Sequence, residues 1–180
     1  MIISKEKRKE NIAEYLLYMF QVEDTIRAYE FDINRIESEL ISQYQQDYEV
    51  KREIREWYNA LISMMKDGQL QKSGHIPIVA TLIKDLNDLH YSLMESDSNS
   101  EYKELHSIAK SALKELKLRG GDTEMNDIQA GLNGLYGFLM LKIQQKTINP
   151  ETLKAFEEIA AMFSYLSNSF KNIEEGKKEI

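Results

Sequence analysis

Chain-breaking residues are rare in this sequence, and their scarcity restricts the fold more than any other feature. The 180 residues include only two prolines and eight glycines, below average usage. Breaks gather at residues 68–77, 96–100, 120–121 and 149–150. Elsewhere apolar residues recur every three or four positions, as in amphipathic helices, and no segment alternates with period two for more than a few residues. The sequence therefore predicts an all-α fold.

The apolar spacing predicts a bundle of six or seven helices in one domain, residues 1–180. The expected helices cover about residues 5–30, 33–43, 48–66, 76–95, 99–119, 124–146 and 150–173. A single helix over 33–66 would be about 50 Å long, so we expect a break near Gln43–Asp47. The mostly charged tail, residues 174–180, is expected to fray.

Start and stop signals support several of these helix ends. Asp32 is expected to cap the second helix. Ser98 and Glu101 have the spacing of a capping box, and Gly120 is expected to end the helix that they open. The run 149–151, Asn-Pro-Glu, combines a cap, a first-position proline and an acidic first turn, so it predicts the start of the last helix.

The helix expected over 124–146 is apolar on nearly all sides between residues 130 and 141, which indicates a central place in the bundle. Gly131, Gly134 and Gly137 lie on one arc of this helix. Each costs about 1 kcal/mol relative to alanine in a helix interior. We expect close approach of a neighbouring backbone to offset that cost.

The charge and the ends of the chain restrict its partners and location. A net charge of −7 and a pI near 5.1 make nucleic acid an unlikely partner. Met1–Glu10 is basic, as in a signal peptide, but Glu14, Glu23 and Asp24 interrupt the stretch that follows and no cleavage site appears. We expect an uncleaved, cytoplasmic chain.

Two further observations agree with that location. The chain has no cysteine, which excludes disulfides and thiolate metal sites and fits a reducing compartment. The longest uncharged stretch in the middle of the chain, Ile128–Leu141, has 14 residues, fewer than the roughly 20 that a membrane-spanning helix requires. We therefore expect no membrane association.

Familiar catalytic and nucleotide-binding motifs are absent from the sequence, including the serine elbow, His-Glu-x-x-His, the P-loop, the dinucleotide fingerprint and the EF-hand loop. His75, His90 and His106 are the only histidines. His75 and His90 would lie about 22 Å apart along one straight helix, so they cannot bind the same ion from it. The sequence predicts no metal site and no cofactor.

Two polar residues, Glu23 and His90, fall within apolar helix stripes, where each needs a hydrogen-bonding partner. Arg27 follows Glu23 by four positions, in the order that favours a helical ion pair. One interpretation is structural, with an ion pair at the edge of the core and a core histidine. The other is that Glu23, Arg27 and His90 converge across two helices into a polar pocket, as candidate site residues.

One basic strip stands out in this acidic chain. Lys103, Lys110, Lys114 and Lys117 project within about 60° of one another, opposite the apolar face of the helix expected over 99–119. A solvated surface is one interpretation. Attachment of an anionic partner is the other.

The helix expected over 48–66 has the widest apolar face, formed by Trp57, Tyr58, Met64 and Met65. Aromatic residues and methionine are enriched at protein interfaces. Part of this face is therefore a candidate homodimer contact.

Short motifs along the chain resemble those of a known family. They are Met1-Ile2-Ile3, Glu6-Lys7-Arg8-Lys9, Asn11-Ile12-Ala13-Glu14-Tyr15, Glu23-Asp24, Ile26-Arg27-Ala28, Ile54-Arg55, Trp57-Tyr58, Gly74-His75, Leu89-His90, Asn133 and Leu135-Tyr136-Gly137. As a set they span essentially the whole chain, which resembles an uncharacterised, all-helical bacterial family (Bacteroides group) with a domain of unknown function. The family's proline-containing turn before the third helix is replaced here by Gln45-Gln46-Asp47. The resemblance implies an intracellular helical protein and no particular activity.

A multi-helix bundle with many tyrosines and no catalytic motif is more often a scaffold than an enzyme. We therefore predict a non-enzymatic, intracellular interaction or scaffold protein that forms a homodimer or binds an unknown protein partner. The alternative hypothesis is a small-molecule-binding or enzymatic bundle with its pocket at Glu23, Arg27 and His90. A third hypothesis is an adaptor that holds an anionic partner on the lysine strip.

Overall fold

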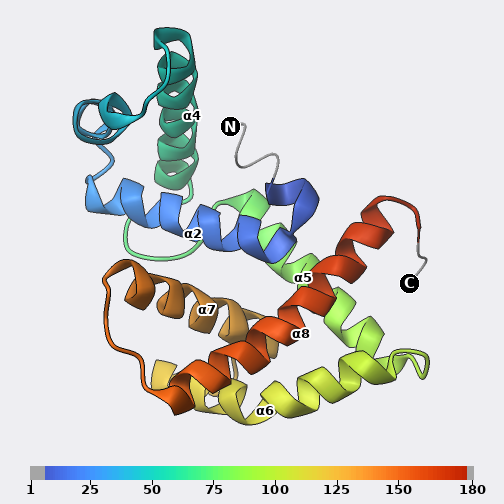
Figure 1. Ribbon diagram of the computed structural model, residues 1–180. Helices are drawn as coiled ribbons and strands as arrows, with labels where there is room; N and C mark the ends of the chain where they lie inside the picture. Colours follow the sequence, from blue (N-terminus) through green and yellow to red (C-terminus); the bar gives the residue numbers. More distant parts are fainter. Residues whose placement is uncertain (1–6, 178–180) are drawn as a thin grey trace.

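The computed structural model describes residues 7–177, and within this range the chain contains helices and loops but no strand (Figure 1). The α-helices are α2 (Ile12–Ala28), α3 (Ile33–Arg35), α4 (Tyr48–Asp67), α5 (Pro77–Glu95), α6 (Ser100–Gly120), α7 (Asp127–Ile143) and α8 (Pro150–Glu174). A π-helical turn, η1 (Ile36–Leu40), and a 3-10 turn, η2 (Ile41–Gln43), follow α3. The predicted all-α class is confirmed.

The described residues leave out parts of two sequence predictions. The first six residues of the basic start, 1–6, and the last three of the tail expected to fray, 178–180, lie outside them. The last helix, α8, reaches Glu174. Among the helices of residues 7–177, none combines the length and the apolar character that crossing a bilayer requires.

Side-chain caps determine where most of the helices begin. The 33–66 segment is not one continuous helix. Asp47 starts a new helix, α4, because its carboxylate accepts the Val50 N–H at 2.9 Å. The expected break near Gln43–Asp47 is therefore present. Asn149 caps α8 as predicted, accepting the Thr152 N–H at 2.7 Å.

Two predictions about helix starts need correction. The helix expected over residues 5–30 is interrupted, because residues 7–10 are helical but Asn11 breaks the helix, accepts the Glu14 N–H and caps α2, which begins at Ile12. The capping box at Ser98 does not form. Its hydroxyl hydrogen-bonds Ser96 Oγ at 2.8 Å instead, and Asn99 occupies the cap position of α6.

The core forms where α2 crosses the later helices (Figure 1). The long helices α6 and α8 make the most extensive contact, and α7 packs against both of them as well as against α2 and α5. Helix α4 packs mainly on α2 and on the turns before it, so it projects from the other helices in Figure 1. Fully buried aliphatic and aromatic side chains from α2, α5, α6 and α8 fill the centre.

Helix α7 is buried only along its first half. Ile128 and Leu132 are fully buried, whereas the residues from 135 to 143 are partly or fully exposed. Gly131 and Gly134 do sit at close contacts. The neighbours there are side chains, Phe163 of α8 and Leu116 of α6, rather than the neighbouring backbone that we expected.

We expect Gly131→Ala to lower the free energy of unfolding by about 1–2 kcal/mol. The new methyl group would overlap the buried Phe163 ring, and such overpacking outweighs the gain of about 1 kcal/mol in helix propensity. Gly120→Ala is the matched control, because in the described part of the chain no atom beyond its own stretch of helix lies within 4 Å of the added Cβ. Urea unfolding measures both, and an unchanged or raised stability for Gly131→Ala would contradict this packing.

Candidate functional site

Glu23 occupies a buried position where α2 meets the start of α5. Its side chain is 1% exposed, and Oε1 accepts the Ile76 N–H at 2.8 Å. Oε2 accepts from His75 Nδ1 at 2.7 Å, and the His75 ring stacks on Phe20 at a centroid distance of 4.1 Å. The α5 cap residue, Ile76, has no side-chain cap of its own. Glu23 therefore places a carboxylate at the positive end of the α5 dipole.

Arg27 holds the loop that precedes α5. Its guanidinium donates to the carbonyl oxygens of Leu70 (3.1 Å) and Gly74, and pairs with Asp24 at 2.8 Å. The Glu23–Arg27 ion pair predicted from the sequence is therefore wrong. Both oxygens of Glu23 are already engaged by His75 and Ile76, and Arg27 reaches Asp24 instead.

His90 belongs to a different polar group, formed where α5, α6 and α7 meet. It is 5% exposed, and its Nδ1 lies 2.7 Å from the hydroxyl of Tyr102, which is fully buried. Its ring lies 5.0 Å from that of His106. His106 Nε2 is hydrogen-bonded to Asp127 Oδ2 at 2.7 Å, and Lys117 Nζ lies 2.7 Å from Asp127 Oδ1. We call these five side chains the histidine cluster.

The structure therefore places Glu23 and Arg27 against the start of α5 and the loop before it, and places His90 in the histidine cluster. Within residues 7–177, no hydrogen bond, ion pair or ring contact joins His90 to Glu23 or Arg27. Glu23 and Arg27 each secure the start of α5 or the loop before it, but through these separate contacts rather than through an ion pair with each other.

The histidine cluster has strongly perturbed electrostatics. Burial, with a smaller contribution from the neighbouring His106, lowers the pKa of His90 to about 4. The hydrogen bond from His106 and the ammonium group of Lys117 hold the pKa of Asp127 well below its usual range, against the effect of burial. At neutral pH the cluster therefore contains an uncharged His90 and an ionised Asp127.

The lysine strip is divided between this cluster and the solvent. Lys117 pairs with Asp127, and Lys103 Nζ lies 3.8 Å from an Asp97 carboxylate oxygen. Lys110 and Lys114 are exposed and make no ion pair within the described part of the chain. Two lysines of the strip thus remain available to an anionic partner.

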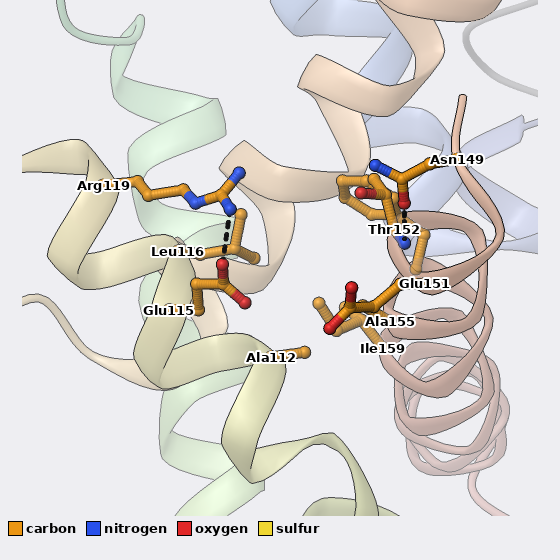
Figure 2. A pocket seen from close by; sticks show the side chains of 10 residues that line it. Ala112, Glu115, Leu116, Arg119, Asn149, Glu151, Thr152, Ala155 and Ile159 are labelled. Atoms are coloured by element: carbon orange, nitrogen blue, oxygen red, sulfur yellow. Dashed lines mark hydrogen bonds and ion pairs between the residues drawn. The ribbon is translucent and has the colours of Figure 1, made fainter. Parts of the chain in front are cut away.

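A surface pocket lies between the end of α6 and the start of α8, and none of the predicted site residues is among those that line it. Figure 2 shows the ion pair of Arg119 and Glu115 on the α6 side of the pocket, across from Thr152 of α8 and the residue that caps α8, Asn149. The pocket encloses about 220 Å³, less than the roughly 300 Å³ at which small-molecule sites begin. None of Glu23, Arg27 and His90 lines it.

Apolar side chains are exposed to different extents on the Trp57 face of α4 and at the end of α7. Trp57 is half-buried, stacked on Tyr18 and in edge contact with Tyr58, although Met64 beside it is exposed. At the end of α7, Leu141 and Ile143 are 37% and 54% exposed. The apolar sequence of residues 130–141 predicts a place in the middle of the bundle, and the exposure at the end of α7 contradicts that prediction.

We expect Glu23→Ala to lower the free energy of unfolding by about 3 kcal/mol. The change leaves the buried Ile76 N–H without an acceptor and removes the partner of His75. Glu53→Ala, at an exposed position of α4, should change stability by less than about 0.5 kcal/mol. Urea unfolding of both proteins makes the comparison, and equal stabilities would show that Glu23 does not anchor α5.

We also expect stability to fall as the pH drops from 6.5 to about 4. In this interval the unfolded chain binds a proton at His90 and the folded chain does not, so acid favours unfolding. Replacement by phenylalanine, His90→Phe, should flatten this part of the profile, while the groups facing His90, which are Tyr102, His106 and Asp127, stay in place. Urea unfolding at several pH values provides the test, and profiles of equal slope would contradict it.

Comparison with known proteins agrees with the resemblance noted in the sequence. No curated protein and no solved structure matches this chain. The model of one family, described as a domain of unknown function (DUF4924), matches residues 1–177. The resemblance to a whole-chain family of unknown function is therefore confirmed, and its bacterial origin stays a prediction. The chain belongs to the DUF4924 family.

Proposed function

We propose that this chain is a non-enzymatic helical interaction module that self-associates through the exposed half of α7. The proposed contact, which we call the α7 surface, is centred on Gly137, Met140 and Leu141, which share one face of the helix, with Phe138 and Ile143 at its two margins. The observation that carries the proposal is the exposure of this apolar helix half.

The composition of the α7 surface supports an interface. Between residues 133 and 143 the only charged residue is Lys142, in a chain whose net charge is −7. Its Nζ lies 4.5 Å from the centroid of the Phe138 ring, and that ring stacks on Phe156 of α8 at 4.5 Å. Depletion of charge around aromatic and methionine side chains is typical of interface centres.

Gly137 supports the same surface by a different argument. A glycine within a helix costs about 1 kcal/mol relative to alanine. The close contacts of Gly131 and Gly134 with Phe163 and Leu116 offset that cost. At Gly137, by contrast, no atom of residues 7–177 beyond the surrounding turn of its own helix lies within 4 Å of an added Cβ. A helix that packed closely on Gly137 would supply the missing compensation.

A second copy of this chain is the occupant that we propose. In a two-fold contact the same patch faces itself, so the two Gly137 positions meet near the axis and the helices can approach closely. The Trp57 face, the dimer contact suggested by the sequence, is the weaker candidate because Tyr18 and Tyr58 already cover much of the indole ring.

We expect the wild-type protein to form a dimer in sedimentation equilibrium, and Leu141→Glu to raise the dissociation constant at least about tenfold. Ile78→Glu is the matched control, since Ile78 is similarly exposed but lies on α5. Gly137→Ala should weaken association as well. If no second helix packed on this face, the same change would leave association unaffected and would only raise the free energy of unfolding.

Three results would contradict the proposal. They are a wild-type protein that remains monomeric at all concentrations, equal effects of Leu141→Glu and Ile78→Glu, and a dimer that Gly137→Ala leaves unchanged. Circular dichroism of each variant verifies that it retains the helical fold, so that a loss of association can be assigned to the surface.

A further inference from the structure

The histidine cluster combines donor atoms that are otherwise far apart in the chain. His90 comes from α5, His106 from α6 and Asp127 from α7. One ligand atom from each of these three residues can be chosen so that all three lie within 4.8 Å of one another. Three helices thus present two imidazoles and one carboxylate to a common point.

We propose that His90, His106 and Asp127 form a binding site for a divalent transition-metal ion, of which Zn²⁺ is the representative. Two imidazole nitrogens and a carboxylate oxygen suit Zn²⁺ and its first-row neighbours, whereas Mg²⁺ and Ca²⁺ prefer oxygen ligands alone. Three protein ligands leave the fourth tetrahedral position to water or to another molecule.

The present geometry must adjust to accept the ion, because the three ligand atoms are now spread over as much as 4.8 Å. Ligand atoms around a tetrahedral Zn²⁺ lie about 3.3 Å apart, from bond lengths of about 2.0–2.1 Å. His106 Nε2 and Asp127 Oδ2 are now 2.7 Å apart across a hydrogen bond. They must therefore separate by roughly 0.6 Å, while the ring proton of His106 moves from Nε2 to Nδ1 and the ion takes its place.

The surrounding side chains orient all the ligands but His106. The hydroxyl of Tyr102 engages His90 Nδ1 at 2.7 Å, so the other ring nitrogen, Nε2, is the one that would bind an ion. Lys117 holds Oδ1 of Asp127 at 2.7 Å and leaves Oδ2 for coordination. Hydrogen bonds of this kind around the ligands are usual at metal sites.

The cluster is also accessible from one side. His90 and Tyr102 lie in the interior, but the side chains of His106 and Asp127 are 12% and 25% exposed. An ion can therefore enter past the Asp127 carboxylate. The ammonium group of Lys117 repels a cation, so this residue limits the affinity of the site for the ion.

Titration of the full-length protein with Zn²⁺ in a calorimeter tests the proposal, with Co²⁺ absorption as a second readout of coordination. We expect one equivalent to bind, and His106→Asn and Asp127→Asn to weaken binding by more than about tenfold. Tyr102→Phe should weaken it by about tenfold, since it removes the partner that orients His90. Lys117→Gln should strengthen it several-fold, an effect that a purely structural ion pair does not predict.

His75→Gln is the matched control, because this histidine lies outside the cluster, and it should leave the affinity unchanged. A second measurement does not depend on the folding of any variant. It follows the imidazole nitrogens of the wild-type protein by nuclear magnetic resonance. Zn²⁺ should shift the signals of His90 and His106 but not those of His75. Absence of saturable binding, undiminished binding in both ligand variants, or a shift confined to His75 would overturn the proposal.

Discussion

The position of α5 depends on a carboxylate that α5 does not supply. Glu23 of α2 accepts the Ile76 N–H at the start of α5, and Arg27, one turn later on α2, holds the Leu70 and Gly74 carbonyls of the preceding loop. A buried carboxylate is unfavourable unless its hydrogen bonds are made, so the angle between α2 and α5 is specified by these contacts as well as by apolar packing. The orientation of α5 in turn determines where His90 meets α6.

The packing of α6, α7 and α8 depends on a different constraint, which is the volume of the side chains between them. Phe163 and Leu116 occupy the space over Gly131 and Gly134, so α8 and α6 can lie close against the first half of α7. Because α6 lies close against α7, Asp127 at the first position of α7 is beside His106 of α6. The packing of these helices and the assembly of the histidine cluster are thus one arrangement.

The sequence predicted the helical class and several helix ends because their causes are local. Apolar spacing and caps such as Asp47 and Asn149 act within a few residues. The candidate site was predicted poorly, because its causes are distant. The acceptor role of Glu23 involves a backbone N–H 53 positions away, and His106 and Asp127 are 21 positions apart on separate helices. An apolar pattern also cannot show whether the chain itself covers a helix face, so the exposure of Leu141 was missed.

Helix α7, 17 residues long, carries both of the places at which we propose binding. Its first residue, Asp127, belongs to the histidine cluster, and the α7 surface lies toward its other end. A packed helix moves as a rigid body, so where an ion draws the start of α7 toward it, and not the Asp127 side chain alone, Leu141 is displaced as well. Any coupling free energy that results is reciprocal. A change in self-association would then alter the affinity for the ion by the same factor as the ion alters self-association.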